Sequence, residues 1–251
     1  MVKIAISGAL GKMGKKVKEA CDAFDSVKPI FGIDIKENLN DANFPIYDSF
    51  EKTEDVPNVI IDFSSPHSLK GLISYAEKVN AGLVLCTTGY DKDDLDMIAT
   101  ASEKIAIFRS ANMSIGVNVL IDLVIKAAKA LENFDVEIIE KHHNEKVDAP
   151  SGTAYMIADA IKNLYPDRFY VCGREGKVGK RNQSEIGIHA IRGGNIVGEH
   201  DVIFCGMDET VTLSHQATDR RVFAMGAIRA AIYLSGKKCG TFDMNDLING
   251  K

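Results

Sequence analysis

The first half of the chain alternates short apolar runs with amphipathic stretches, a pattern typical of strands that alternate with helices. The opening run KIAIS ends at glycine and is followed by Val17, Ala20, Cys21 and Phe24 at helical spacing. Four further strand-like runs follow: IFGI at 30–33, VIIDFSS at 59–65, GLVLC at 82–86 and KIAIF at 104–108. This alternation predicts a doubly wound α/β domain with a parallel sheet and right-handed connections.

After about residue 113 the pattern changes. A helix is predicted over 115–131, with Ser114 before it, and another over about 219–234. Between them lie four strand-like runs with fewer helices: VEIIE at 136–140, EIGIHAIR at 185–192, VIFCG at 202–206 and TVTLSHQA at 210–217. Runs of this kind favour an antiparallel or mixed sheet, hence a smaller α+β domain. The segment GREGKVGKRNQS at 173–184 is glycine-rich and basic and reads as a long loop.

Composition narrows the class of protein. Of 251 residues, 45% are apolar and 26% charged, as in an ordinary globular protein. The net charge of −5 argues against a nucleic-acid partner, and no apolar run approaches the roughly 18 residues of a membrane span. The start MVKIAISG enters a strand pattern directly, so we expect no signal peptide. Five scattered cysteines without a C-x-x-C pair favour reduced thiols and a cytoplasmic protein.

A glycine-rich turn between the first strand and the first helix predicts a dinucleotide site. Gly8, Gly11 and Gly14 have the spacing G-x-x-G-x-x-G, which allows a tight turn and close approach of backbone to a pyrophosphate. The helix N-terminus favours the anion. Asp34 ends the second strand, twenty residues after Gly14, where an acidic side chain receives the ribose hydroxyls. A turn that serves only the fold is the alternative.

Ligands of parallel sheets bind at the carboxyl ends of the strands. Thr87, Thr88 and residues 110–113 each follow a strand directly, so we expect them to line the cofactor cleft. Capping of a helix is a second possible role for Thr87 and for Ser114. We therefore predict a Rossmann-type dinucleotide-binding domain of residues 1–113 and about 218–251, and a substrate domain of about 114–217, with hinges near Ser114 and 217–222.

The densest cluster of chemical groups is EKHHNEKVDAPSGTA, at 140–154. Strand alternation puts Val136, Ile138, Glu140 and His142 on one face and His143 on the other. The two adjacent histidines therefore need not do the same work. Structural histidines are the alternative, and a metal site is disfavoured because the histidines diverge and no further ligands have zinc-like spacing. We expect no metal.

The loop after this strand adds a cation and a helix N-terminus. Lys146 lies on the loop, and Ser151 or Thr153 caps the helix that follows Pro150. Gly152 lets the backbone at that helix start come close to a carboxylate. A dicarboxylate could be held here by the ammonium and the backbone amides. An imidazole that titrates near neutral pH could protonate it as a hydride arrives.

The run EIIEKHHNEKVDAPSGTA closely resembles the signature of the dihydrodipicolinate reductase family, the 4-hydroxy-tetrahydrodipicolinate reductases of the diaminopimelate–lysine pathway. The resemblance covers essentially the whole chain, through GALGKMG, IDFSSP, CTTGY, SANMSIGVN, GREGKVGKR, EIGIHAIRGGNIVGEH and LSGKKCGTFDM. It implies reduction to tetrahydrodipicolinate by a reduced nicotinamide and a homotetramer built through the sheets of the substrate domain. Apolar alternation on both faces of EIGIHAIR and TVTLSHQA also calls for a partner that covers the second face.

Individual residue roles follow from the resemblance. His142 is implied as the acid/base, Lys146 as the proton donor or its electrostatic partner, and His143, Gly152 and Thr153 as substrate contacts. The implied cofactor contacts are Gly8, Ala9, Leu10, Gly11, Lys12, Met13, Asp34, Cys86, Thr87, Thr88, Ser110, Ala111, Asn112 and Met113. This chain departs from the family at Cys86, where glycine is common, and at Lys180, where Gly-Glu-Arg is usual.

The residues around Asp34 predict which nicotinamide is used. A carboxylate there accepts hydrogen bonds from both ribose hydroxyls and repels a 2′-phosphate, and Ile35 stands where an NADPH enzyme usually has arginine. Lys12 and Lys36 are close to Asp34 or the glycine turn in the sequence, and either could reach a 2′-phosphate and so reduce the preference for NADH over NADPH. We expect NADH to be preferred and NADPH tolerated. Without the resemblance, the residues predict a reductase of some carboxylated imine or carbonyl, or an NAD(H)-sensing module.

Overall fold

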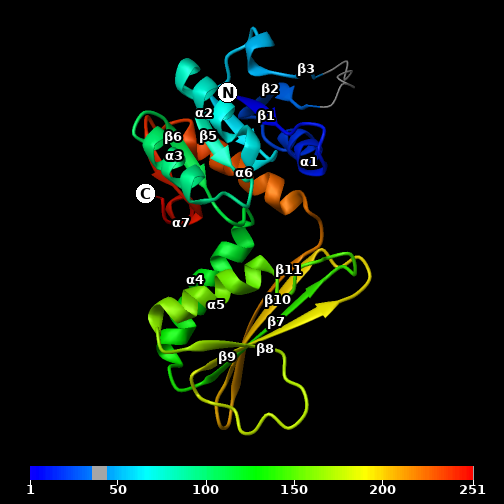
Figure 1. The fold of residues 1–251 in the computed structure, drawn as a ribbon, viewed down its shortest axis with the longest axis vertical. Helices are drawn as coiled ribbons and strands as arrows, with labels where there is room; N and C mark the ends of the chain where they lie inside the picture. Colours follow the sequence, from blue (N-terminus) through cyan, green and yellow to red (C-terminus); the bar gives the residue numbers. More distant parts are fainter. Residues whose placement is uncertain (36–43, 251) are drawn as a thin grey trace. The chain divides into compact units, whose positions relative to one another are not determined.

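The computed structural model describes residues 1–35 and 44–250. The chain forms two compact units: Met1–Ile115 together with Arg220–Lys251, and Gly116–Asp219. Figure 1 shows the helices and strands of each unit. Lys36 of the cofactor prediction lies outside the described residues.

The first unit is built on a seven-stranded parallel sheet, with strand order β12-β6-β5-β4-β1-β2-β3. Its strands are β1 (Val2–Ser7), β2 (Val27–Ile33), β3 (Ile46–Tyr47), β4 (Val59–Asp62), β5 (Gly82–Leu85), β6 (Ala106–Arg109) and β12 (Gly240–Phe242). Its α-helices are α1 (Lys12–Cys21), α2 (Leu69–Val79), α3 (Lys92–Ser102), α6 (Arg221–Leu234) and α7 (Met244–Asn249). Two 3-10 turns, Phe50–Lys52 and Pro66–Ser68, complete the regular structure.

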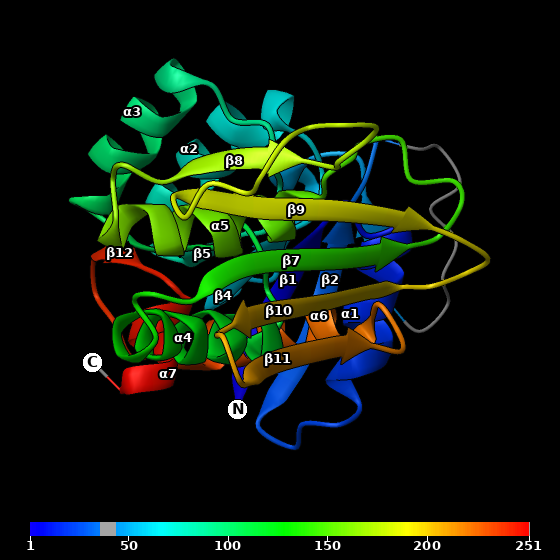
Figure 2. The same ribbon diagram turned by 90° about the horizontal axis from the view of Figure 1, so that it is seen from below.

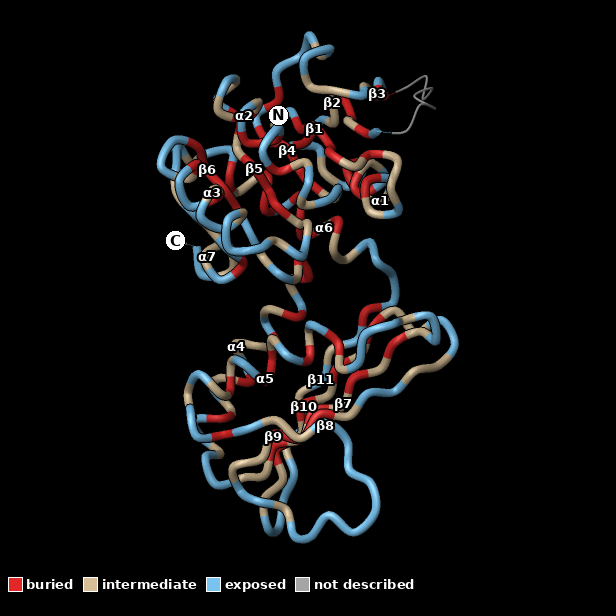
Figure 3. Tube along the Cα trace, viewed as in Figure 1, coloured by how far each residue is buried: buried red, intermediate tan, exposed pale blue. Residues whose placement is uncertain are grey.

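Both faces of this sheet are covered. Ile4, Ile6 and Ile61 pack against α1 and α6 on one face, while Ala5 and Ile60 pack against α2 and α3 on the other. Figure 3 shows the buried residues, in red, concentrated along these strands. Strands buried on both faces read as continuous apolar runs, which is why VIID and GLVLC are so hydrophobic.

The second unit contains a five-stranded mixed sheet, with strand order β11-β10-β7-β9-β8 (Figure 2). The strands are β7 (Asp135–His142), β8 (Phe169–Cys172), β9 (Glu185–Arg192), β10 (Gly198–Cys205) and β11 (Thr210–Ala217). The pairs β7–β9 and β8–β9 are parallel, and the others antiparallel. The helices α4 (Ile115–Ala130) and α5 (Gly152–Leu164) pack on one face. The predicted fold class, a Rossmann-type parallel sheet plus a mixed-sheet α+β unit, is confirmed.

Alternation along β7 divides its side chains between the two faces, as predicted. Val136, Ile138, Glu140 and His142 are buried toward the helices. Figure 2 shows the opposite face with no helix in front of it. Along β11 the prediction of apolar residues on both faces is wrong, because its outer positions are threonine, serine and glutamine, all exposed. Hydrophobic residues of β11 are confined to the helix side.

The unpredicted elements are short or lie at sheet edges. These are β3, β8, β12, α7 and the 3-10 turn Phe50–Lys52, none longer than six residues. Such elements carry too few residues for a periodic pattern to stand out.

The structure shows which residues cap α5 and α3. Ser151 caps α5, because its Oγ accepts a hydrogen bond from the Ala154 N–H, whereas Thr153 lies inside the helix. The cap of α3 is Asp91 rather than Thr87.

Candidate active site

In the glycine turn of the first unit, each position requires glycine for a different physical reason. A Cβ at Gly14 would lie 2.1 Å from the Gly8 carbonyl oxygen, and one at Gly8, where φ is +76°, would lie 2.6 Å from the Phe63 carbonyl oxygen. These two glycines are required by the fold itself. Gly11 is the N-cap of α1 and provides no side chain to bond the first amides of the helix. The helix start is thereby left for an anionic ligand.

Asp34 lies directly beside this turn. The residue is 9% exposed, and its Oδ2 accepts a hydrogen bond of 2.9 Å from the Leu10 N–H. Its own N–H donates to the Tyr47 carbonyl oxygen at 3.0 Å. The carboxylate is therefore held against the loop that carries Ala9 and Leu10, while residue Ile35 is 93% exposed. Lys12, on the first turn of α1, is exposed as well.

A cavity of about 210 Å³ brings together residues from distant parts of the first unit. Of the predicted cofactor contacts, Met13, Cys86, Ser110, Ala111, Asn112 and Met113 line it. Phe63 and Phe223 also line it, and sequence reasoning missed both. The predicted strand runs to residue 65, whereas β4 ends at Asp62, so Phe63 lies at the strand end, where ligands bind. Phe223 lies on α6, and no local signal marks it.

Asp62 is a fully buried carboxylate at the end of β4, next to this cavity. It accepts hydrogen bonds from Ser64 Oγ at 2.5 Å and from Thr87 Oγ1 at 2.7 Å. Thr87 is thus oriented by a buried charge, while Thr88 is exposed. Burial, reinforced by Asp62, raises the pKa of the Cys86 thiol well above its usual value, so Cys86 is a neutral group in the cavity wall.

In the second unit, the predicted cluster is organised around Glu140, which is fully buried. Its Oε2 lies 2.6 Å from His142 Nδ1 and accepts from Arg192 Nη1 at 2.7 Å. Its Oε1 accepts from Arg192 Nη2 at 2.7 Å and from the Ser151 N–H at 2.9 Å. Burial alone would raise the pKa of Glu140, but the bonds from Arg192 and His142 outweigh it and the pKa is lowered. Glu140 is therefore an anion.

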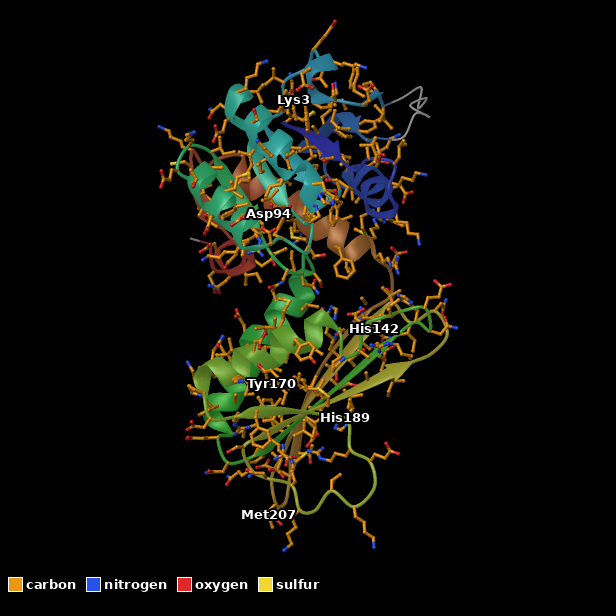
Figure 4. All side chains as sticks on the ribbon, viewed as in Figure 1. Lys3, Asp94, His142, Tyr170, His189 and Met207 are labelled. Atoms are coloured by element: carbon orange, nitrogen blue, oxygen red, sulfur yellow. The ribbon has the colours of Figure 1, made fainter. Side chains whose placement is uncertain are left out.

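His142 lies at the carboxyl end of β7 (Figure 4) and is 9% exposed. Burial lowers the pKa of His142 below its ordinary value, and Glu140 only partly offsets this. Its ring also packs against the backbone of β10, because a Cβ at Gly198 would approach Nε2 to 3.1 Å. Next to it stands His200, whose ring centroid is 5.3 Å away and whose Nε2 is 3.1 Å from Ser151 Oγ. Burial lowers the pKa of His200 to about 4.

The loop after β7 carries the predicted cation. Lys146 Nζ pairs with Asp148 Oδ1 at 2.8 Å, and its N–H donates to the His143 carbonyl oxygen at 3.2 Å. Arg192 Nη2 donates to the Asp148 carbonyl oxygen, so the arginine ties this loop to Glu140. His143 is half-buried and follows the residue that ends β7.

The start of α5 completes the cluster. Gly152 is exposed, and a Cβ there would have no heavy atom within 4 Å. Neither packing nor a positive φ explains this glycine, in contrast to Gly8 and Gly14. Thr153, in the first turn, is half-buried. The N-terminus of α5 at Gly152 suits an anionic ligand such as a carboxylate.

Sequence reasoning placed Glu140 on the face of His142 but gave it no role. It missed Arg192 and His200 as parts of the cluster, which lie there because β7 pairs with both β9 and β10.

Across residues 1–35 and 44–250, no group of three or more metal-ligating side chains is placed to hold an ion. None of the helices in this part of the chain could span a lipid bilayer.

Comparison with known proteins matches both units to one family. Residues 2–113 match the family model for the N-terminus of dihydrodipicolinate reductase, and residues 116–248 match the model for its C-terminus. A 4-hydroxy-tetrahydrodipicolinate reductase from Clostridium tetani is 46% identical over 251 residues, which cover 99% of this chain and 98% of the relative. Another, from Caldanaerobacter subterraneus subsp. tengcongensis, is 48% identical over 249 residues, with the same coverage.

Solved structures share the fold. The dipicolinate-bound dihydrodipicolinate reductase from Paenisporosarcina sp. TG-14 superposes with a TM-score of 0.81 at 24% identity, covering 98% of this chain and 99% of the other. GenD2 from gentamicin A biosynthesis, in complex with NAD, gives a TM-score of 0.64 at 12% identity, covering 98% and 90%. Both family models and the relatives that match over the whole length show the same family. The chain therefore belongs to the dihydrodipicolinate reductase family of NAD(P)H-dependent oxidoreductases.

Proposed function

We propose that this protein reduces 4-hydroxy-tetrahydrodipicolinate to tetrahydrodipicolinate in lysine and diaminopimelate biosynthesis. The observation that carries the proposal is the cluster in the second unit: a buried imidazole at His142, an ammonium at Lys146 and an open helix start at Gly152. The first unit binds the dinucleotide in this proposal, and the second binds the substrate. Relatives that match over the whole chain carry the same enzyme name.

The proposed substrate is a dicarboxylate, and the second unit offers complementary charge for it. Lys146 supplies a cation, and the first amides of α5, at Gly152 and Thr153, supply donors aided by the helix dipole. His143 is the further substrate contact in this proposal. The related reductase from Paenisporosarcina sp. TG-14 was solved with dipicolinate bound, which supports a dicarboxylate ligand of similar shape.

The residues also provide for the proton that the reduction consumes. Reduced nicotinamide supplies the hydride. Loss of the 4-hydroxyl group together with a hydrogen from the neighbouring carbon, as water, gives the conjugated C=C–C=N system of the ring. The hydride then adds to the carbon that carried the hydroxyl, the displaced electron pair moves toward the nitrogen, and one proton delivered to the neighbouring carbon completes the reduction. We assign this proton transfer to His142 Nε2, with Lys146 as the donor or its electrostatic partner, because both titratable groups lie next to the carboxylate site.

Removal of either group tests the assignment. His142→Ala and Lys146→Ala should lower kcat by about 10²–10⁴-fold, the usual contribution of an acid–base group. The assay follows loss of NADH absorbance with enzymatically generated substrate. Unchanged kcat in His142→Ala would remove that residue from the reaction. Tight NADH binding by the unsubstituted protein with no turnover would instead favour an NAD(H)-sensing module.

For the cofactor, we propose that NADH is preferred and NADPH tolerated. Asp34 is held at the glycine turn by its bond from the Leu10 N–H, at the place where ribose hydroxyls are bound in this fold. Its charge opposes a 2′-phosphate, while Lys12 on the same turn is exposed and can reach an anion. The ratio of kcat/KM for the two cofactors decides the matter, and a tenfold advantage for NADPH would contradict the proposal.

We also propose a homotetramer formed through the outer face of the five-stranded sheet. Phe169 and Ile191, from neighbouring strands β8 and β9, are 44% and 46% exposed, and Ile139 and Ile203 on β7 and β10 are half-buried. Exposed apolar residues on a sheet face are stabilised when a second copy covers them. Light scattering at micromolar concentration should give four times the 27.4 kDa of one chain, and a monomer would contradict the proposal.

A cytoplasmic location is proposed as well. It rests on the five free cysteines, of which Cys172 and Cys239 are exposed. Exposed thiols that form no disulfide are typical of a reducing compartment.

A further inference from the structure

We propose that Glu140 and Arg192 are a positioning pair for His142, which fix the tautomer of its ring and set the pH at which its Nε2 exchanges a proton. The inference rests on the proposed function for the identity of the reaction. It concerns two residues that the sequence-based assignment left without a role.

Contacts at Glu140 determine where the hydrogen on His142 lies. Glu140 accepts two bonds from Arg192 and one from the Ser151 N–H, which together hold both carboxylate oxygens in place. A carboxylate that is ionised can only accept, so His142 Nδ1, at 2.6 Å, is the donor. When the ring is neutral, its single hydrogen is therefore on Nδ1, and Nε2 is the nitrogen that gains and loses a proton.

Nε2 is left available for this exchange. Among the described residues, no hydrogen bond reaches His142 Nε2. The missing side chain at Gly198 provides the room for that side of the ring, since a Cβ there would lie 3.1 Å from Nε2. The buried carboxylate of Glu140 thus holds the imidazole of His142 by Nδ1 and leaves Nε2 available to a ligand.

Arg192 determines how strongly the acid acts on the base. An unpaired buried carboxylate at 2.6 Å would hold the imidazole protonated through most of the neutral range. The guanidinium fork of Arg192 shares that charge through two bonds, and Lys146 adds a second cation near the ring. His200, the other titratable group beside the ring, is neutral at these pH values. Consistent with this balance, the pKa of His142 is lowered, first by burial and then by these cations, against Glu140.

Substitution of Glu140 and substitution of Arg192 should shift the pKa of His142 in opposite directions. A merely structural role of the pair would not produce this result. Glu140→Gln removes the negative charge and lets the ring adopt either tautomer, so the pKa of His142 should fall and its Nε2–H form should appear. Arg192→Met leaves the carboxylate uncompensated, so the pKa of His142 should rise. Arg192→Lys keeps the charge and should bring that pKa back toward the unsubstituted value.

The experiment is nitrogen NMR on the ligand-free protein with ¹⁵N-labelled histidine, titrated between pH 4 and 9, with His142→Gln used to assign the signal among six histidines. Far-UV circular dichroism checks that each variant is folded. Glu77→Gln, which breaks the surface pair with Lys104, is the matched control and should change neither tautomer nor pKa. If Glu140→Gln does not fold, the comparison of Arg192→Met with Arg192→Lys decides the same question.

Kinetics then separate this inference from the proposed function. In Glu140→Gln we expect kcat to fall by about 100-fold, the lower end of what acid–base catalysis contributes, with the KM for NADH changed by less than about 2-fold. A pKa of His142 that is unmoved in the folded variants, or moved in the same direction by Glu140→Gln and Arg192→Met, would overturn the positioning role. No turnover by the unsubstituted protein would overturn the proposed function and leave the NMR result standing.

Discussion

At the scale of single residues, Asp34 combines two tasks in one carboxylate. One oxygen accepts the Leu10 N–H and so anchors the glycine turn, and the charge disfavours a 2′-phosphate. The two tasks depend on different properties, hydrogen-bond acceptance and net charge. A substitution that keeps the first and removes the second therefore separates them.

Asp34→Asn is that substitution, because the amide oxygen still accepts from Leu10 while the charge is lost. We expect kcat/KM for NADPH to rise relative to that for NADH by about 10-fold, which corresponds to about 1.4 kcal/mol. Asp34→Ala, which also loses the hydrogen bond, should lower the activity with both cofactors. Steady-state kinetics with each cofactor measures the ratio, and an unchanged ratio in Asp34→Asn would show that the charge does not discriminate.

At the scale of elements, α1 and α5 both carry a glycine in their first turn, near a proposed anion site, but for different reasons. Within α1, Gly14 is required because any Cβ would collide with the Gly8 carbonyl oxygen at 2.1 Å. At the first position of α5, Gly152 meets nothing. The first helix therefore needs glycine for its own packing, and the second keeps the space in front of its amides free.

Replacing each glycine by alanine tests this contrast. Gly14→Ala should lower the free energy of unfolding by about 3 kcal/mol, since the backbone must move to relieve the overlap. Gly152→Ala should leave that free energy within about 1 kcal/mol of the original value, in the stabilising direction. Its KM for the dicarboxylate should nevertheless rise, by about 10-fold, as expected if one charge-assisted hydrogen bond is weakened. Urea unfolding and substrate kinetics supply the two measurements, and an unchanged KM would remove Gly152 from the carboxylate site.

At the scale of the whole molecule, buried ionisable groups of the second unit make stability depend on pH. Burial lowers the pKa of His200 to about 4, from an ordinary value of 6.5. Between those values the unfolded chain binds more protons than the folded one, so stability falls as pH falls. The pKa of Glu137 is lowered to about 2, because bonds from Arg174, Arg181 and His189 outweigh the effect of burial. Its stabilising effect is present above pH 4.5 and is lost on going down to 2.

We therefore expect the urea midpoint to decline in two stages, first from about pH 6.5 to 4 and then more steeply below 4.5. His200→Gln should flatten the first stage, and Glu137→Gln the second. Unfolding curves recorded by circular dichroism at several pH values measure this. A midpoint that is constant from pH 7 to 4 would contradict the buried neutral state of His200.

Much of the local structure, and most of the residues that can do chemistry, could be predicted from the pattern of the sequence. Apolar runs predicted the central strands, because burial on both faces demands hydrophobic residues at every position. Alternation along β7 predicted that Glu140 and His142 share a face, and the glycine turn predicted the dinucleotide fold. These are properties of neighbouring residues, and a linear pattern records them.

Tertiary structure alone decided which distant residues meet. Arg192 reaches Glu140 because β9 pairs in parallel with β7, and His200 stands beside His142 because β10 pairs on the other side. Phe223 joins the cavity of the first unit from a helix more than a hundred residues after Met113. Strand order and register arise from the packing of the whole sheet, so no spacing along the chain could identify these partners or show that Glu140 is an anion that orients His142.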